Sequence, residues 1–469
     1  NYPLDLWEAG ALVKSWQYQE GFPIYSSITS ESATWMYGPF KLYLIGAFFS
    51  FTGFNFYIGR LLSFLAIITA IFLFLKFFLR GQKYKLLSLY IALCLIFIYD
   101  LKLNIFIQTR PESIPILCSL IFLFIFYKGL NRKSLILNVA SSIILVIGFF
   151  FKQTVAAIAI VPITAMMFSR INLFNRTNFL FATIPFFSIL ISILYLYLFQ
   201  PEIYHYMLEV PSQYKIPPSS LYQWTYRFLI SIPLFYLFLY HWVTEESLEN
   251  RSQKDYFNQF QDGHLISWVF AAILVMTGIG IISSAKEGGT WNSLAYSVFS
   301  IYAFLLLKME NFLSALVNVS KINFWKAFLL SSMIGILILL GAFKGNASDL
   351  KPRVGGYGDS GHQEVLQIVQ SLPGKVVCPQ DPTIPLIAKG YAGQSIIFEY
   401  DASGWKWPLS SVLSEVRAAD YVITLGKNGS WREWPFINHK QILQDLNFEP
   451  MELQEIKASD YQIWHKTLD

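Results

Sequence analysis

The chain has 469 residues, of which 54% are hydrophobic and only 14% are charged. Soluble globular domains carry about 25% charged residues, so this composition excludes a single water-soluble domain, and its apolar content excludes a disordered chain. The net charge of +5 gives no reason to expect nucleic acid as a partner. Three cysteines are too few for a disulfide framework. The sequence therefore predicts a protein that crosses a membrane several times.

The chain begins with a polar and aromatic segment, which we expect to form an extracytoplasmic first loop over residues 1–55. Asp5 and Glu8 lie three residues apart, a spacing that places both side chains on one face of a helix. Such a pair suits general-base catalysis or metal coordination, whereas an ordinary acidic helix start is the alternative. Residues 39–52 predict an apolar helix in the outer membrane interface. Because the chain starts with Asn1, we expect that a preceding span is missing.

Ten apolar runs follow, and they predict a transmembrane helical bundle of about ten spans over residues 56–343. They lie at residues 56–79, 86–103, 114–126, 135–151, 154–168, 179–199, 228–243, 265–282, 294–307 and 327–343. A spanning helix needs roughly 17–25 residues, so re-entrant segments are an alternative for the shorter runs. Basic residues crowd the first, third and fifth connections, which places these loops in the cytoplasm and the others outside.

From residue 344 onward the composition becomes mixed and polar. Apolar runs of four to five residues alternate there with helical patterns. This alternation predicts a small extracytoplasmic α/β domain over residues 344–469. The predicted fold class is therefore a polytopic α-helical membrane protein with a small C-terminal α/β domain outside.

Several polar residues fall at the predicted outer ends of the spans. Arg110 and Glu112 precede the third apolar run, and Lys152 and Gln153 interrupt the stretch 135–168. A lysine at membrane depth is costly and indicates a functional site with an anionic partner. A plain helix–helix turn, with the lysine reaching the lipid headgroups, is an equally good interpretation.

Further cations lie on the same predicted side. Arg60 is near the outer end of the first span, and Lys286 and Asn292 flank a glycine-containing loop suited to phosphate or sugar hydroxyls. Two carboxylates and four cations thus converge on the outer face of one apolar bundle. Such a site suits an amphiphilic anion whose tail lies in lipid, because cations bind the phosphate and a carboxylate can deprotonate an attacking group.

At these positions the chain resembles GT-C glycosyltransferases, and within them the dolichyl-phosphate-mannose/protein mannosyltransferase-like group (glycosyltransferase family 39 and its bacterial relatives). The opening motifs are Asp5-x-x-Glu8, Gly21-Phe-Pro-Ile-Tyr25, Tyr37-Gly-Pro39 and Gly59-Arg-Leu-Leu-Ser63. Later landmarks are Arg110-Pro-Glu112, Lys152-Gln-Thr154 and Gly288-Gly-Thr-Trp-Asn292. The resemblance covers most of residues 1–345.

The resemblance implies an inverting transfer of a sugar from a polyprenyl-phosphate donor to an acceptor at the extracytoplasmic face. It implies that Asp5 is the first candidate base with Glu8 as its partner, that Glu112 is the second-loop acid, and that Lys152 lies near the lipid phosphate. Many members carry adjacent acids in the first loop, so the spacing here leaves open which residue is the base. No cofactor is expected with certainty, and a divalent metal is an option.

Two other functions fit the same composition. A lipid or solute transporter would carry charges at several depths and two related halves. Here the polar residues gather at one face and no half resembles the other, which favours the enzyme. A catalytically inactive GT-C-like subunit of a membrane complex is the third interpretation. The expected partners are the lipid-linked donor, membrane lipids and an acceptor that is a protein, a lipid or a glycan.

Overall fold

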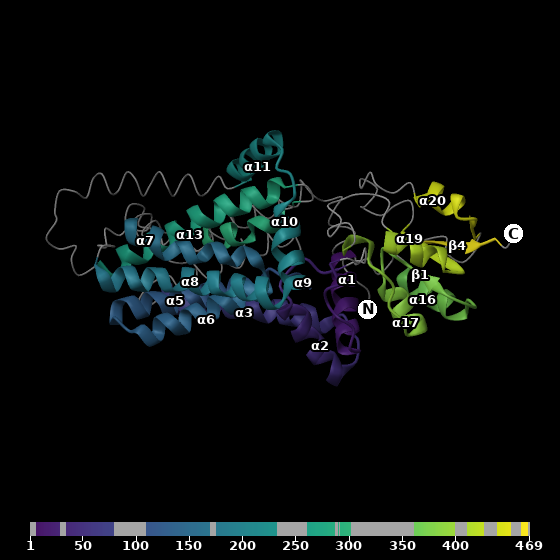
Figure 1. Cartoon of the computed structure of the whole chain (residues 1–469), viewed down its shortest axis with the longest axis horizontal. Helices are drawn as coiled ribbons and strands as arrows, with labels where there is room; N and C mark the ends of the chain where they lie inside the picture. The colour runs from purple at the N-terminus through teal and green to yellow at the C-terminus, as the bar shows by residue number, and fades with distance from the viewer. Residues whose placement is uncertain are drawn as a thin grey trace, which may run out of the picture.

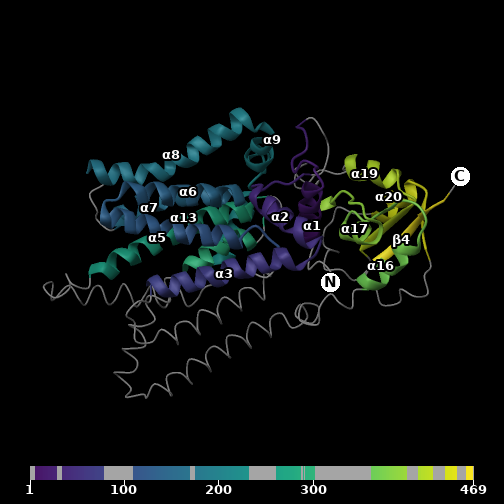
Figure 2. The same ribbon diagram turned by 90° about the horizontal axis from the view of Figure 1, so that it is seen from below.

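The computed structural model describes residues 6–28, 34–78, 109–168, 175–231, 260–286, 289, 291–301, 361–398, 410–425, 439–451 and 461–467. Three parts follow one another along the long axis of the molecule (Figure 1). A bundle of apolar helices lies at one end and an α/β unit at the other. Two helices, α1 (Leu6–Gln19) and α2 (Phe40–Thr52), lie between them (Figures 1 and 2).

The bundle is made of helices whose sequences are almost wholly apolar. They are α3 (Tyr57–Phe78), α5 (Ser113–Arg132), α6 (Leu135–Phe151), α7 (Val161–Phe168), α8 (Arg176–Phe199) and α13 (Phe260–Ala285). Helices α5 and α6 form a tight antiparallel pair, in which a Cβ atom on Gly148 would lie only 3.0 Å from Cys118 Cβ. The turn between them uses Lys133 in the left-handed region and the Ser134 hydroxyl as the cap of α6.

Four described helices are long and apolar enough to cross a membrane. They cover Tyr57–Phe74, Ser113–Arg132, Arg176–Phe199 and Trp268–Ala285. The chain is therefore an integral membrane protein. The spans expected at 86–103 and 327–343 lie outside the described residues, and those at 228–243 and 294–307 are described only at their starts. The count of about ten spans consequently stays a prediction.

The expected span at 154–168 has a different form in the structure. A 3-10 stretch, η1 (Gln153–Ile160), leads into the short helix α7. Pro162 lies in the first turn of α7 and has no N–H to donate to the preceding turn. The α-helix therefore begins only at Val161, and the apolar run is divided into two short pieces.

Short helices connect α8 back to the bundle on the side of α1. They are α9 (Pro201–Tyr204), the π-helical turn η2 (His205–Glu209), α10 (Val210–Ser212) and α11 (Pro218–Ser231). A further 3-10 turn, η4 (Trp291–Leu294), follows α13. Tyr206 and Val210 pack with Trp35 in one hydrophobic cluster, so this connection and the 34–38 segment share a core.

The C-terminal part is a four-stranded sheet with helices, as the alternation of patterns predicts. Its elements are α16 (His362–Ser371), β1 (Val376–Val377), α17 (Thr383–Lys389), α19 (Ser410–Arg417), β2 (Tyr421–Leu425), α20 (His439–Asp445), β3 (Phe448–Pro450) and β4 (Tyr461–Lys466). The strand order is β1-β2-β4-β3. Strands β1 and β2 are parallel with Val376 opposite Tyr421, and the other two pairs are antiparallel. The side of the membrane on which the unit lies, and the expected domain boundaries, stay predictions.

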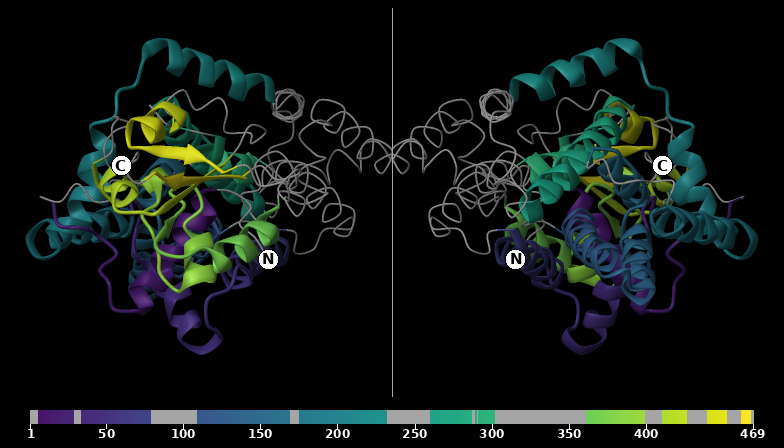
Figure 3. Two further views of the ribbon diagram at one scale, coloured as in Figure 1. Left: turned by 90° about the vertical axis from the view of Figure 1, so that its right-hand side faces the viewer. Right: turned by 90° about the vertical axis from the view of Figure 1, so that its left-hand side faces the viewer.

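The α/β unit packs directly on α1. Phe398 is 2% exposed and meets the ring of Trp7 at 5.6 Å and that of Trp35 at 5.3 Å, in edge-to-face geometry. Gly10 allows this approach, because a Cβ atom there would lie 2.8 Å from the Phe398 ring. Views along the long axis show the unit lying over α1 and the end of the bundle (Figure 3).

Candidate active site

The candidate active site lies where the end of the bundle meets α1 and α2. Five segments that are far apart in the sequence supply its charged side chains: α1, α2, the start of α3, the start of α5 and the turn after α6. Two ion pairs organise the site, and each joins residues 40 or more positions apart.

Glu8 on α1 forms the first ion pair with Arg60 on α3. The guanidinium donates from Nε to Glu8 Oε1 at 3.0 Å and from Nη2 to Oε2 at 2.7 Å. Thr109 adds its backbone N–H at 3.0 Å and its hydroxyl at 2.9 Å, both to Oε1. Glu8 is fully buried, so these charge-assisted bonds replace its lost hydration. The sequence predicts that Glu8 and Arg60 share the site, and the structure brings them into direct contact.

Lys152 and Glu112 form the second ion pair. Lys152 Nζ lies 2.7 Å from Glu112 Oε1, and both side chains are almost fully buried. The pairing depends on a break in the helix, because Lys152 adopts an extended backbone (φ −154°, ψ 124°) between α6 and η1. Glu112 lies directly before α5, at the same end of the bundle. The Lys152 ammonium also lies 5.6 Å from the Tyr37 ring centroid, a cation–π contact.

Lys41, on the first turn of α2, joins the two ion pairs into one cluster. Its side chain is 3% exposed, and its Nζ has no hydrogen-bond partner among the described residues. Burial lowers the pKa of Lys41 to about 7, the carboxylates of Glu112 and Glu8 oppose this shift, and Arg110 and Lys152 reinforce it. Lys41 therefore interacts electrostatically with both ion pairs.

Sequence reasoning missed Lys41. The residue lies within the apolar run 39–52, which was interpreted as an interfacial helix without a role in the chemistry. A signal was present, because Lys41 is the sole charged residue of α2, and it follows Tyr37-Gly-Pro39, one of the motifs of the resemblance.

The remaining predicted residues have different positions. Arg110 is half-buried beside the cluster, and Gln153 donates to the Met36 carbonyl at 3.3 Å. Lys286 instead donates to the carbonyl of Pro211 at 2.7 Å, so its described contact is with the α10 connection. Asn292 lies in η4, but its side chain is outside the described part, as is the whole of Asp5.

No metal site is evident among the described residues. In that part of the chain, no three residues of the types His, Cys, Asp or Glu lie close enough to hold an ion. Glu8 already meets a guanidinium on both carboxylate oxygens, so a metal ion there would have to displace Arg60.

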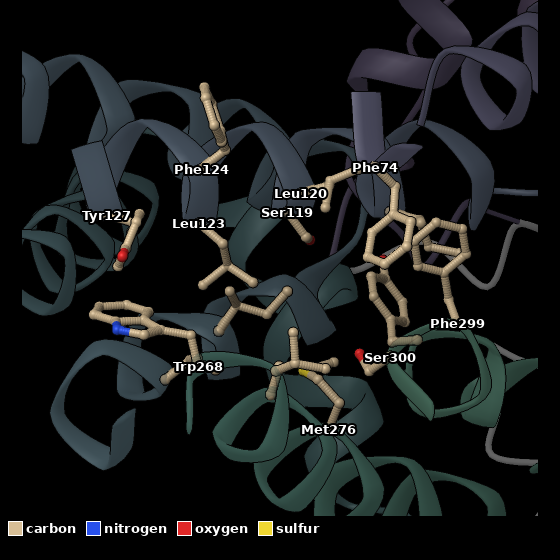
Figure 4. A pocket seen from close by; sticks show the side chains of 16 residues that line it. Phe74, Ser119, Leu120, Leu123, Phe124, Tyr127, Trp268, Met276, Phe299 and Ser300 are labelled. Atoms are coloured by element: carbon tan, nitrogen blue, oxygen red, sulfur yellow. The ribbon is translucent and has the colours of Figure 1, made fainter. Parts of the chain in front are cut away.

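An apolar cavity lies inside the helical bundle (Figure 4). Ile116, one turn after Glu112 on α5, contributes to its wall. Phe74, Trp268, Tyr296 and Phe299 line it from other helices. Tyr296 also interacts electrostatically with Glu112, which places the cavity beside the second ion pair. The described lining contains no charged side chain, so the cavity is suited to hydrocarbon.

Comparison with known proteins identifies the class of fold. No protein-family model matches the chain, and neither does any curated protein. Solved structures do match over almost the whole chain, and they belong to a GT-C glycosyltransferase. The GT-C type of fold predicted from the motifs is therefore confirmed.

The matching structures are of ArnT from Cupriavidus metallidurans. The crystal structure with bound undecaprenyl phosphate has 11% sequence identity and a TM-score of 0.56, covering 98% of this chain and 94% of that one. The apo-state structure has 12% identity and a TM-score of 0.54, with 99% and 93% covered. At such low identity the likeness shows the fold alone, and the residues of the site must carry the argument about function.

Proposed function

We propose that the protein is a glycosyltransferase that moves a sugar from a polyprenyl-phosphate donor to an acceptor. The observation that carries the proposal is a buried cluster of cations and carboxylates at one end of an apolar bundle, which also contains an apolar cavity. Among the described residues, the cluster contains the carboxylates Glu8 and Glu112, and its cations are Arg60, Arg110, Lys152 and, when protonated, Lys41. A polyprenyl phosphate has the complementary shape, with a phosphate for the cluster and a hydrocarbon tail for the cavity. Undecaprenyl phosphate bound to the ArnT structure of the same fold supports this choice.

The proposed reaction follows from where charge develops. The acceptor's nucleophilic atom attacks the anomeric carbon opposite the phosphate, and the bond from that carbon to the phosphate oxygen breaks. The phosphate leaves with the bonding electrons and gains a second negative charge. Lys152 and Arg110 stabilise that charge in a site that excludes water, where such stabilisation is strongest. Attack from the opposite face inverts the anomeric configuration.

A carboxylate of the first segment takes the proton of the acceptor in this proposal. Glu8 has both oxygens bound by Arg60, and Thr109 also donates to one of them. These bonds fix the orientation of the Glu8 carboxylate. The contacts of Glu8 thus support a positioning role for it and the role of base for Asp5. The extracytoplasmic face, the acceptor class and a contribution from Lys286 and Asn292 belong to the same proposal.

A double variant tests the proposal. Removing one partner of a buried ion pair costs about 3–5 kcal/mol, because the other charge is left unpaired. The variant Glu112→Gln/Lys152→Met instead removes both charges together, so it should fold while lacking the central cation. We expect binding of undecaprenyl phosphate and sugar transfer to fall by roughly 100-fold each, the usual scale for a lost desolvated charge contact.

The assay uses purified protein in detergent with a panel of undecaprenyl-phosphate-linked sugars, with and without a chelator to test for a metal. The matched control is Lys128→Met, which removes an exposed lysine on α5. Wild-type protein that binds no undecaprenyl phosphate, or a double variant with undiminished transfer, would disprove the proposal. Movement of the intact lipid across proteoliposomes, without release of the sugar, would instead establish the transporter.

A further inference from the structure

Lys41 is a buried lysine for which the proposed reaction gives no individual role. Its Nζ is enclosed by protein, and it has no hydrogen-bond partner among the described residues. An ammonium group in such a place loses its hydration without any compensating bond, which is among the most costly arrangements in a protein. Either the group is neutral there, or an anion that joins the cluster compensates it.

The charged groups that act on Lys41 come from three segments near α2. Glu8 faces it from α1, Glu112 and Arg110 from the segment before α5, and Lys152 from the turn after α6. Each of the two carboxylates is already paired with another cation, Glu8 with Arg60 and Glu112 with Lys152. Among the described residues, the cluster therefore holds no carboxylate dedicated to Lys41.

A ligand anion is the natural partner that completes this arrangement. Arg110 and Lys152 both repel the ammonium form of Lys41, and a phosphate that enters beside these cations reduces that repulsion. Once a phosphate lies among these groups, its charge stabilises the ammonium form of the nearby lysine. The burial that keeps the free amine neutral also strengthens its attraction to the bound anion, because the local dielectric is low.

We propose that Lys41 is a proton-linked phosphate-binding residue, which takes up a proton as a phosphate group enters the cluster and releases it when the phosphate leaves. The proton comes from water: the amine of Lys41, a hydronium ion and the phosphate give the lysine ammonium, water and the bound phosphate. The identity of the phosphate as that of a polyprenyl carrier rests on the proposed function. The proton uptake itself requires only a bound phosphate group, whatever molecule carries it.

The proposal has a consequence for the order of events in the reaction. The donor phosphate is a diester with one negative charge, whereas the departing polyprenyl phosphate is a monoester with two. The product therefore favours the ammonium form of Lys41 more than the donor does, and loss of that proton to water would accompany product release. We expect product to dissociate faster as the pH rises.

Calorimetry of phosphate binding tests the proposal directly. Undecaprenyl phosphate is titrated into purified protein at pH 8 in two buffers with different ionisation enthalpies, so that proton uptake can be measured. The second pKa of a phosphate monoester is about 6, so the ligand is already a dianion at pH 8. Burial lowers the pKa of Lys41 to about 7, so the free residue is mostly neutral at this pH. We expect a net uptake of protons that approaches one per bound ligand.

Two substitutions separate the charge of Lys41 from its titration. Lys41→Arg keeps a cation that does not titrate, so we expect binding without proton uptake and with no dependence on pH between 8 and 9. Lys41→Met removes the cation, so we expect weaker binding and no uptake. The affinity of the wild-type protein should fall by about tenfold over the same pH unit, because the proton must be taken from a more alkaline solution. The exposed-lysine control Lys128→Met should behave like the wild-type protein.

Further titrations identify the source of the phosphate. Inorganic phosphate and phosphatidylglycerol micelles are titrated in the same way. Uptake that depends on Lys41 with inorganic phosphate or phosphatidylglycerol, but not with undecaprenyl phosphate, would support the proton linkage and contradict the glycosyltransferase proposal.

The opposite failure is distinguishable. Tight binding of undecaprenyl phosphate with no proton uptake, or with equal uptake in the Lys41 variants, would overturn the linkage and leave the glycosyltransferase proposal intact. If Lys41→Met does not fold, the wild-type protein is compared with Lys41→Arg, which keeps the charge. That comparison alone then shows whether the proton is taken up by Lys41.

Discussion

Two glycines near the charged cluster allow backbone and side-chain approaches that no larger residue permits. A Cβ atom on Gly59 would lie 2.3 Å from the Thr109 side chain, and one on Gly38 would lie 1.8 Å from the carbonyl oxygen of Phe150. Gly59 thereby lets Thr109 donate two hydrogen bonds to Glu8, and Gly38 lets the segment with Tyr37 lie against the end of α6. Both glycines belong to motifs of the resemblance, Gly59-Arg-Leu-Leu-Ser63 and Tyr37-Gly-Pro39.

The substitution Gly59→Ala should therefore disturb Glu8 without touching it. The new methyl group would displace Thr109, and two hydrogen bonds to a buried carboxylate would be lost, each worth about 1.5–3 kcal/mol. We expect a fall in thermal stability and at least a tenfold loss of sugar transfer. Thermal unfolding and the donor assay measure these effects.

Gly278→Ala is the matched control for this substitution. It also lies in a bundle helix, and a Cβ atom there meets no other atom within 4 Å. If both alanine variants lose stability and activity equally, then the contact of Gly59 with Thr109 has no special part in the site.

At the scale of elements, the break between α6 and η1 determines the position of the Lys152 ammonium group in the site. If α6 continued through Lys152, the lysine would follow the helical path of α6. Its extended backbone instead lets the side chain reach Glu112 at the start of α5. The apolar runs 135–151 and 154–168, separated by Lys152 and Gln153, predict this break correctly. The bounds of α6, Leu135–Phe151, are those of the first run.

Other parts of the site could not be predicted in the same way. Periodicity and composition report on neighbours along the chain, but Glu8 is 52 residues from Arg60 and 101 from Thr109. The sequence indicates that such residues lie at one end of the bundle. Only the packing of the helices determines which carboxylate pairs with which cation. Lys41 was missed for a related reason, because an apolar run with a single lysine resembles an interfacial helix whose charge faces the headgroups.

Exchange of the second ion pair tests whether the position of the cation matters. The variant Glu112→Lys/Lys152→Glu keeps one charge of each sign but moves the ammonium from the turn after α6 to the start of α5. Each single substitution places like charges together and should destabilise the protein by about 3–5 kcal/mol. We expect the exchange to recover most of that stability in thermal unfolding, but not sugar transfer. An exchanged variant with wild-type activity would show that only the presence of the pair is required.

At the scale of the whole molecule, the α/β unit contacts both partners of the first ion pair through their neighbours. Phe398 packs on Trp7, which directly precedes Glu8. His362, at the start of α16, lies 6.4 Å from the Phe56 ring, and the Arg60 guanidinium lies 5.8 Å from the same ring. The unit therefore helps to fix the positions of α1 and the start of α3 relative to each other. It supplies no charged residue to the described cluster.

The substitution Phe398→Ala should loosen this attachment and leave the α/β unit folded. Phe398 is almost fully buried between Trp7 and Trp35, and removal of such a ring costs about 3–5 kcal/mol. We expect faster hydrogen–deuterium exchange in α1 with unchanged protection of β2 and β4, and a reduced rate of sugar transfer. Phe448→Ala supplies the reciprocal control, because Phe448 lies on β3 beside β4 and packs in the core of the unit, so its loss should expose β2 and β4 first. Exchange of α1 that does not respond to the loss of Phe398 would mean that the bundle alone positions Glu8. In that case the α/β unit would have to act elsewhere, on the acceptor or on a partner.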